Sequence, residues 1–329
     1  MTAPLFSRRT AVTAAAAAFA LPLSGCAAPE VPNCCAASTA DKPVAVTPPD
    51  MILGEGPLWS ARDNALYWVD IRGKKLHRLN FTDNSQQSWD MPDIIPWVVE
   101  RQSGGFLVAI LRTVHALTLD PFTLTPLFTI EGDIAGNRLN DAKVDAQGRL
   151  WTGTMDMAFK DRTAALYRID ADLSVHQMDT GYVCTNGPAF SKDGRTMYHN
   201  ETHDGLVYAF DVAADGAISN KRVFAKFADG VGLPDGCTVD ADDGLWVSHY
   251  GGGRASRYLP DGTWDFDIMI PAKQSTSLTF AGPELDRMFN TTAAQPPVDA
   301  DDPLAGTLFE MPKSWLRGHK GLPTPAFAG

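Results

Sequence analysis

Six short phrases of similar composition recur along the chain, and four of them place an oxygen-bearing side chain at one equivalent position. These four residues are Glu55, Asn140, Asn186 and Asp235. Carboxylate and amide oxygens are the ligands that hard divalent cations prefer. If the fold brings equivalent positions together, these residues predict a metal site with positions left open for water and a substrate.

The spacing of the phrases indicates the elements that must position these residues. Each phrase continues through a turn rich in Gly, Asp and Asn into a second apolar stretch, as in a β-hairpin. The repeat of roughly 40–50 residues is typical of propeller blades. We therefore predict an all-β fold over residues 51–312. It is a six-bladed β-propeller with four-stranded antiparallel blades around a central metal-containing channel.

The first 26 residues are typical of an export signal. Ser7-Arg-Arg-Thr10 precedes an Ala-rich apolar stretch that ends at Leu23 and is too short to span a bilayer. The paired arginines resemble a twin-arginine signal, and Leu23-Ser-Gly-Cys26 resembles a lipoprotein cleavage box. We expect an exported, periplasmic protein with a lipid on Cys26, the alternative being ordinary cleavage without lipid.

Two further segments flank the predicted propeller. The Pro-containing residues 27–50 are interpreted as a tether that ends in a short strand, Val44-Ala-Val46, which closes the ring. The run Gly306–Glu310 is interpreted as an inner strand of the last blade, and residues 313–329 as a C-terminal extension.

Charge and missing motifs narrow the function classes. The formal net charge of −11 argues against nucleic acid or an anionic membrane as the main partner. The sequence has no His-Glu-x-x-His, no Gly-x-Ser-x-Gly and no glycine loop of the phosphate-binding type. Zinc peptidases, serine hydrolases and nucleotide enzymes therefore lack support, and oligomeric state cannot be inferred.

Several other residues invite functional readings, but ordinary structural roles are favoured for them. Cys184 and Cys237 flank the candidate ligands; we expect buried free thiols, with an oxidised pair as the alternative. Tryptophans on the predicted strands should fill the spaces between blades; they are Trp59, Trp68, Trp151 and Trp246. Three histidines that follow second strands are expected to lie on the surface or to have hydrogen-bond partners within the protein; they are His199, His203 and His249.

The ordered motifs resemble the gluconolactonase/regucalcin family of six-bladed propellers. The match covers nearly all of residues 51–312 and rests on Leu53-Gly-Glu-Gly-Pro-Leu-Trp59, Arg138-Leu-Asn-Asp141, Gly148-Arg-Leu-Trp-Thr-Gly-Thr-Met155, Thr185-Asn-Gly187 and Leu233-Pro-Asp-Gly236. The resemblance implies one divalent metal held by Glu55, Asn186 and Asp235, substrate contacts from Arg138 and Asn140, and hydrolysis of sugar lactones. Asp156 is a further candidate substrate contact.

The sequence departs from the family pattern at three places, which leaves the substrate's identity open. They are Asn140-Asp-Ala142, Phe280-Ala-Gly282 and Glu201-Thr202, where the family often has Asn-Asp-Gly, Phe-Gly-Gly and an Asp-Ser or Asp-Thr pair.

The chemistry of the predicted site suggests metal-dependent hydrolysis of an aldonolactone, with Asp235 as general base. Oxygen ligation favours calcium, with zinc, manganese or magnesium as alternatives. Two other functions stay open. Apolar residues expected near the channel mouth, Ile95, Trp97 and Phe159, suit a lactonase or esterase acting on a non-sugar substrate. The second open function is a propeller that holds a metal and binds a ligand without hydrolysing it.

Overall fold

The computed structural model describes residues 41–296 and 301–329, which lie in one compact unit, Ser38–Gly329. The predicted signal segment and Cys26 lie outside the described residues, so export and lipidation stay predictions. Within the described part of the chain, no helix is long and apolar enough to cross a membrane.

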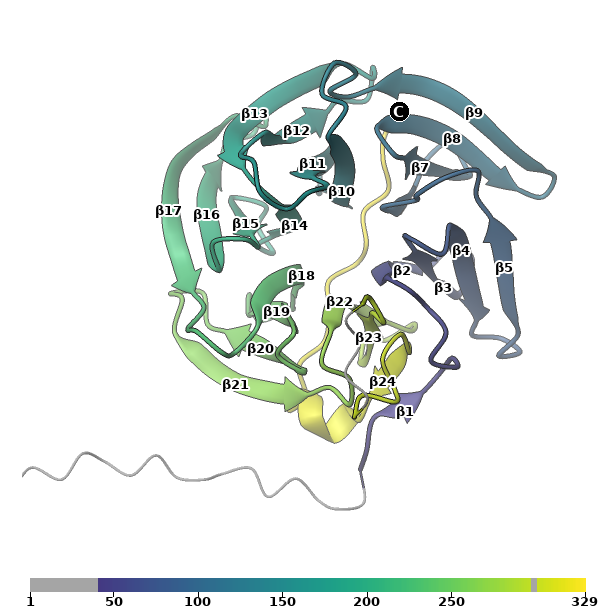
Figure 1. Cartoon of the computed structure of the whole chain (residues 1–329), viewed down its shortest axis with the longest axis vertical. Helices are drawn as coiled ribbons and strands as arrows, with labels where there is room; N and C mark the ends of the chain where they lie inside the picture. The colour runs from purple at the N-terminus through teal and green to yellow at the C-terminus, as the bar shows by residue number, and fades with distance from the viewer. Residues whose placement is uncertain (1–40, 297–300) are drawn as a thin grey trace, which may run out of the picture. The chain divides into compact units, whose positions relative to one another are not determined.

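The described residues form six four-stranded antiparallel sheets, and this confirms the predicted all-β propeller of six blades (Figure 1). The first three blades run from the inner to the outer strand in chain order. Their strands are β2 (Gly54–Ser60), β3 (Ala65–Asp70), β4 (Lys75–Asn80), β5 (Gln86–Asp90); β6 (Val98–Glu100), β7 (Phe106–Ile110), β8 (Thr113–Leu119), β9 (Phe122–Thr129); β10 (Asn137–Val144), β11 (Leu150–Asp156), β12 (Ala164–Ile169) and β13 (Val175–Tyr182).

The fourth and fifth blades repeat this order, whereas the sixth is built from both ends of the propeller sequence. Their strands are β14 (Thr185–Phe190), β15 (Thr196–Glu201), β16 (Leu206–Val212), β17 (Ile218–Lys226); β18 (Leu233–Val239), β19 (Leu245–Tyr250), β20 (Arg254–Tyr258), β21 (Trp264–Met269); β22 (Ser275–Ala281), β23 (Arg287–Thr292), β24 (Phe309–Met311) and β1 (Val44–Ala45).

Ring closure depends on β1, which pairs antiparallel with β24 through Val44 and Glu310. The N-terminal strand thus becomes the outermost strand of the last blade, and this joins the two ends of the propeller sequence in one sheet. The interpretation of Gly306–Glu310 as an inner strand was wrong, because β24 is the third strand and β22 is the innermost.

Large apolar side chains fill the wedges between neighbouring blades, as expected for the four strand tryptophans. Trp151 packs with Met197 and Phe210 of the next blade, and Trp246 packs with Phe280. Aspartates at the end of the repeated phrase fix two of these indoles, since Asp145 accepts a hydrogen bond from Trp151 Nε1 (2.8 Å) and Asp240 accepts one from Trp246 Nε1 (2.7 Å). The repeat therefore encodes packing as well as candidate ligands.

A C-terminal tail, residues 321–329, crosses the centre of the ring after a short 3₁₀ helix, η1 (Lys313–Leu316) (Figure 1). At its start, Gly321 forms a β-bridge with Asp240 of the fifth blade. At its end, Phe327 N donates to Glu100 O and Gln102 N donates to Phe327 O, both at 2.8 Å. Because Phe327 is also fully buried, the tail ties opposite parts of the ring together.

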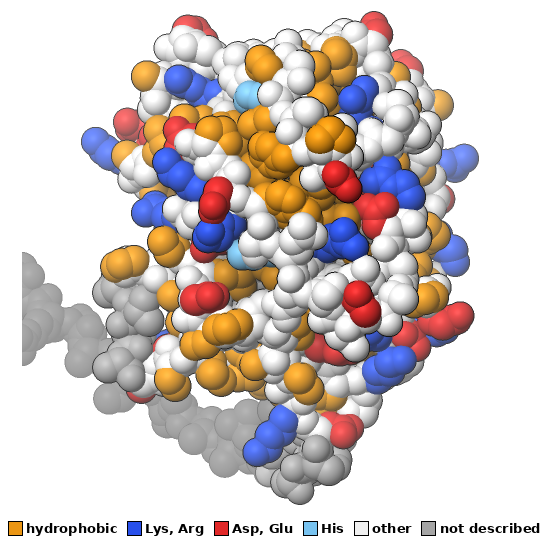
Figure 2. Space-filling view, turned by 90° about the vertical axis from the view of Figure 1, so that its right-hand side faces the viewer, with side chains coloured by type: hydrophobic (Ala, Val, Ile, Leu, Met, Phe, Trp, Pro, Cys, Tyr) orange, Lys and Arg blue, Asp and Glu red, His pale blue; other side chains and the backbone are white. Residues whose placement is uncertain are grey.

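The outer rim carries charges of both signs. Figure 2 looks onto the side where β5 and β9 lie and shows acidic and basic side chains interspersed around an apolar area. This face, with charges of both signs, lacks the continuous basic patch that is typical of nucleic-acid-binding proteins.

Candidate metal and substrate site

The four candidate ligands lie on the innermost strands of four blades, each next to a β-bulge. Pairing with the second strand shifts register between Glu55 and Leu58, Leu139 and Ala142, Asn186 and Ala189, and Pro234 and Cys237. A bulge bends a strand locally and redirects a side chain. Gly56 and Gly187 have φ of 50° and 79°, conformations that favour glycine, directly after Glu55 and Asn186.

The candidate residues from these four strands converge on one pocket of about 290 Å³. Glu55, Arg138, Asn140, Asn186 and Asp235 all line it. The rest of the lining contains residues that the sequence analysis did not select, because they lie outside the repeated position. The main ones are Arg72, Met155, Met157, Thr202, Tyr250 and Gln295.

A chain of hydrogen bonds orients the amides. Arg138 Nη1 donates to Asn140 Oδ1 (2.7 Å), and Asn140 Nδ2 donates to Asn186 Oδ1 (2.9 Å). Asn186 Nδ2 in turn donates to Thr202 Oγ1 (2.8 Å), whose hydroxyl donates to Pro234 O (2.8 Å). The amide nitrogens are therefore committed to protein partners, which leaves amide oxygen as the atom that Asn186 offers to a cation.

Three buried carboxylates gather at this site: Glu55, Asp235 and Asp141. Burial, followed by the charge of Asp141, raises the pKa of Glu55 from 4.5 to about 8. Burial and the charges of Glu55 and Asp141 raise the pKa of Asp235 well above 3.8. Without a compensating cation, this arrangement favours proton uptake by the acids.

Arg138 supplies a permanent positive charge to the pocket. Burial lowers the pKa of its guanidinium to about 10, so it stays protonated at neutral pH. Its Nη1 also donates to Leu139 O (2.9 Å), which fixes the group within its own strand. Arg138 is thus held by neutral oxygens, and no ion pair between it and an acid occurs among the described residues.

Asp156 is not among the residues that line the pocket, and its contact with substrate stays a prediction. Its carboxylate accepts hydrogen bonds from the backbone N–H groups of Ala158, Lys160 and Asp161 within its own turn. These bonds, that of Asp161 first, lower the pKa of Asp156. An acid in such a turn is committed to backbone donors, and sequence spacing gave no sign of this local role.

The three apolar residues expected near the mouth separate in the structure. Phe159 lines the pocket, whereas Trp97 lines a second cavity and Ile95 is fully buried in the core between the first two blades. The apolar part of the candidate mouth therefore comes mainly from Phe159 with Met155 and Met157.

The two cysteines near the site are buried free thiols, as expected. Burial raises the pKa of Cys184 well above its ordinary value and that of Cys237 to about 12. In the protein without a metal, both thiols stay protonated at neutral pH. The carboxylates and amides of the pocket offer oxygen atoms as ligands.

Histidines play no part in lining this pocket. His199 and His249 are buried and His203 is exposed. His249 bonds to Val231 O and Ser256 Oγ, which fits the expected structural role, whereas neither ring nitrogen of His199 has a hydrogen-bond partner.

Two other groups of acids and histidines could geometrically hold an ion: Glu201, His203 and Asp204, and Asp240, Asp242 and His319. Members of both already have protein partners. Asp204 pairs with Arg162 (2.8 Å), and the buried Asp240 pairs with Arg257 (2.7 Å). These groups are accounted for by ion pairs within the protein.

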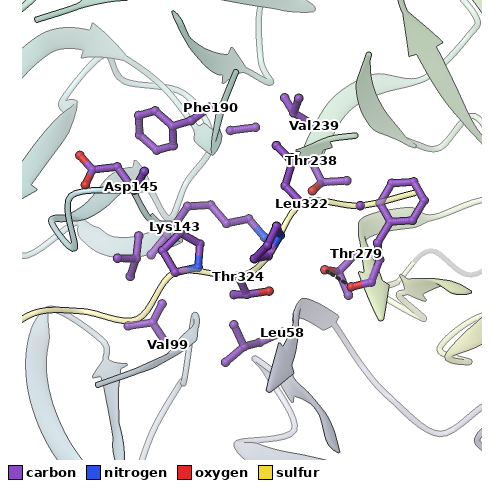
Figure 3. A pocket seen from close by; sticks show the side chains of 18 of the residues that line it. Leu58, Val99, Lys143, Asp145, Phe190, Thr238, Val239, Thr279, Leu322 and Thr324 are labelled. Carbon is purple, nitrogen blue, oxygen red and sulfur yellow. Dashed lines mark hydrogen bonds between the residues drawn. The ribbon is translucent and has the colours of Figure 1, made fainter. Parts of the chain in front are cut away.

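Further along the same inner strands lies a second cavity, of about 400 Å³ (Figure 3). Its walls include Leu58, Val99, Phe190 and Val239, and residues 321–325 of the tail cover it. Figure 3 shows Lys143 reaching into its centre, where Leu322 and Thr324 of the tail lie. The charge of Lys143 partly opposes the rise in the pKa of Glu55 and Asp141.

Fold and site define a six-bladed propeller with a buried oxygen-donor cluster in a small pocket. Residues 53–294 match the SMP-30/Gluconolactonase/LRE-like region, and the chain belongs to this family. It is 32% identical to 6-deoxy-6-sulfogluconolactonase from Pseudomonas putida, covering 78% of this chain and 90% of that protein. It is also 32% identical to L-arabinolactonase from Azospirillum brasilense, covering 84% and 92%.

A solved relative supports the same assignment. The structure of regucalcin from Agrobacterium tumefaciens, described as a calcium-binding protein, superimposes with a TM-score of 0.81 at 26% identity and covers 88% of this chain and 98% of that one. Relatives therefore include sugar lactonases and a calcium-binding propeller.

Proposed function

We propose that this protein hydrolyses a sugar lactone to its aldonic acid in a reaction that depends on one divalent cation. The observation that carries the proposal is the convergence of Glu55, Asn186 and Asp235 with Arg138 and Asn140 in one pocket. Lactonase relatives at 32% identity agree with it.

The residues present fit a hard cation. The carboxyl groups of Glu55 and Asp235 are buried and close enough to share a hydrogen bond when one of them is protonated. Asn186 adds a neutral amide oxygen. Two carboxylates and one amide balance a divalent charge and leave positions open. Calcium is the expected ion because the proposed donors are carboxylate and amide oxygens; zinc, manganese and magnesium are the alternatives.

A bound divalent cation would supply Lewis acidity toward the lactone carbonyl and would lower the pKa of a bound water. Arg138 would bind the substrate's oxygens with charge-assisted hydrogen bonds, since its guanidinium stays protonated in the pocket. Asn140 would orient a sugar hydroxyl. Burial of the pocket floor keeps bulk water away and strengthens these interactions.

Asp235 is the proposed general base. It takes a proton from the attacking water as the water oxygen bonds to the carbonyl carbon. The ring C–O ester bond then breaks, and the proton held by Asp235 passes to the departing alkoxide. Substrate and water are converted to one hydroxy acid, and Asp235 returns to its starting charge.

The test is to follow acid release from glucono-, xylono- and arabinono-lactones with chelator-treated protein and after adding back each divalent ion. We expect turnover of at least one lactone that disappears on chelation and returns with calcium. Hydrolysis that survives complete metal removal would contradict the proposed chemistry.

The two alternative functions, a non-sugar lactonase and a binding propeller, would each give a different result. Faster turnover of aryl or acyl-homoserine lactones than of sugar lactones would indicate a non-sugar lactonase, for which Phe159, Met155 and Met157 give an apolar wall. Tight ligand binding without acid release would indicate a binding propeller.

A further inference from the structure

Arg72 is a cation at the candidate site that the proposed reaction does not use. It lies in the turn between β3 and β4, is exposed to solvent, and lines the pocket together with Ile71. Its guanidinium makes no hydrogen bond or ion pair with any residue that the structure describes. Two other arginines of the propeller, Arg162 and Arg254, pair instead with aspartates at 2.8 and 3.1 Å.

No acid among the described residues pairs with Arg72, so its guanidinium is available to a ligand in the pocket. Its positive charge acts on Arg138, whose pKa it helps to lower, and on Tyr250, whose phenol it makes easier to ionise, so all three lie near one another on the pocket wall. Two neighbouring guanidinium groups repel each other unless an anion lies between or beside them. A guanidinium also matches the planar or tetrahedral oxygens of an oxyanion better than an ammonium does.

The rest of the pocket determines which end of a substrate could be anionic. Glu55, Asp141 and Asp235 are buried near one another, and even with a divalent cation they disfavour a further negative charge at the floor. Arg72, by contrast, is exposed at the rim. A neutral lactone ring therefore suits the floor, and an anionic group suits the rim.

We propose that the substrate is a lactone that carries an anionic oxyacid group at the end remote from the ring ester, and that Arg72 binds this group. This inference rests on the proposed function, since it names the substrate class of the same site. Sulfonate, phosphate and carboxylate share the required chemistry. The pocket volume of about 290 Å³ limits the ligand to about one sugar unit.

The first test compares kcat/KM for gluconolactone with kcat/KM for 6-phosphogluconolactone, 6-deoxy-6-sulfogluconolactone and a glucarolactone. We expect at least one anionic lactone to be favoured by about 10-fold or more, and the favoured one identifies the oxyacid. Arg72→Gln should reduce that preference by about 10- to 100-fold, and Arg72→Lys should retain part of it.

The matched control is Arg195→Gln, which removes an exposed arginine from the turn between β14 and β15, outside this pocket. It should leave the preference unchanged, which excludes a general effect of net charge. Added salt should weaken the preference of the unmodified protein, because the ion pair at the rim is exposed to solvent.

A binding measurement separates this inference from the proposed function. Calorimetric titration of the metal-loaded protein with 6-phosphogluconate and gluconate should show tighter binding of the phosphate, lost in Arg72→Gln. Equal handling of neutral and anionic lactones, or a preference that survives Arg72→Gln, would overturn the inference while leaving lactonase activity intact. Arg72-dependent binding without hydrolysis of any lactone would instead overturn the proposed function.

Discussion

The two ends of the inner strands differ sharply although only a few residues separate them. On β2 the buried carboxylate of Glu55 lines the candidate site, and Leu58 lines the second cavity. On β18 the same change occurs between Asp235 and Val239. One end collects buried acids and stays open to a ligand, whereas the other has mostly apolar walls around Lys143 and is covered by the tail.

This difference shows how the fold separates chemistry from stability. Uncompensated buried acids destabilise a folded protein, so the site end depends on a cation or on protonation. At the covered end, the tail is bonded to the fifth blade through Gly321 and to the second blade through Phe327. Activity and stability should therefore respond to different substitutions.

The largest expected effect is at the site end. Asp235→Asn should lower lactone hydrolysis by about 1,000-fold or more, because it removes both the proposed base and one charged ligand. The melting temperature of the chelator-treated variant should equal or exceed that of the parent, since the metal-free site no longer has to bury the acid of Asp235 at neutral pH. Hydrolysis rates and thermal melting of the same preparations check both statements.

Asp193→Asn is the control for this substitution, because Asp193 is an exposed turn acid outside the pocket. The comparison between the two ends breaks down if Asp235→Asn unfolds the metal-free protein or keeps substantial activity.

The next effect is at the covered end. Phe327→Ala should lower the free energy of unfolding by about 3–5 kcal/mol, because it removes a fully buried aromatic ring from the core between the second and third blades. Activity per folded molecule should change little. Urea unfolding measures the loss, and Phe122→Ala, at a ring that is 45% exposed, should cost far less. Equal costs at the two positions would show that the tail does not stabilise the ring.

The smallest effect concerns His199, which lies in neither cavity. Burial lowers the pKa of this imidazole to about 3, from 6.5. Between these values the unfolded chain binds a proton that the folded protein does not, so stability is lost as pH falls below about 6.5. From pH 7 to 5 the loss should be on the order of 2 kcal/mol.

His199→Phe should remove this part of the acid sensitivity, since neither ring nitrogen has a hydrogen-bond partner to lose. Urea unfolding of both proteins at pH 7 and pH 5 gives the difference, and the acids of the site cancel because they are common to both. An unchanged pH dependence in the variant would mean that His199 is not buried as a neutral group.

The repeated phrase predicted the number of blades, the all-β class and the pocket residues Glu55, Asn140, Asn186 and Asp235. Such prediction works because each blade repeats the same hairpins, so equivalent sequence positions become equivalent positions in the ring. The role of these residues as ligands remains a proposal. The place of β24 was misjudged because a strand's position within a sheet depends on pairing partners far away in sequence.

By itself, the sequence determined what is periodic and local: the inner strands, the turns, the tryptophan wedges and the oxygen-bearing slot. Only the tertiary structure decided that Asp141 joins the buried acids, that Asp156 turns to its own backbone, and that Arg72 reaches the rim. It also decided that the tail covers one end of the inner strands. The physical reason is that these placements depend on ring closure and loop paths, which bring together residues that share no sequence period.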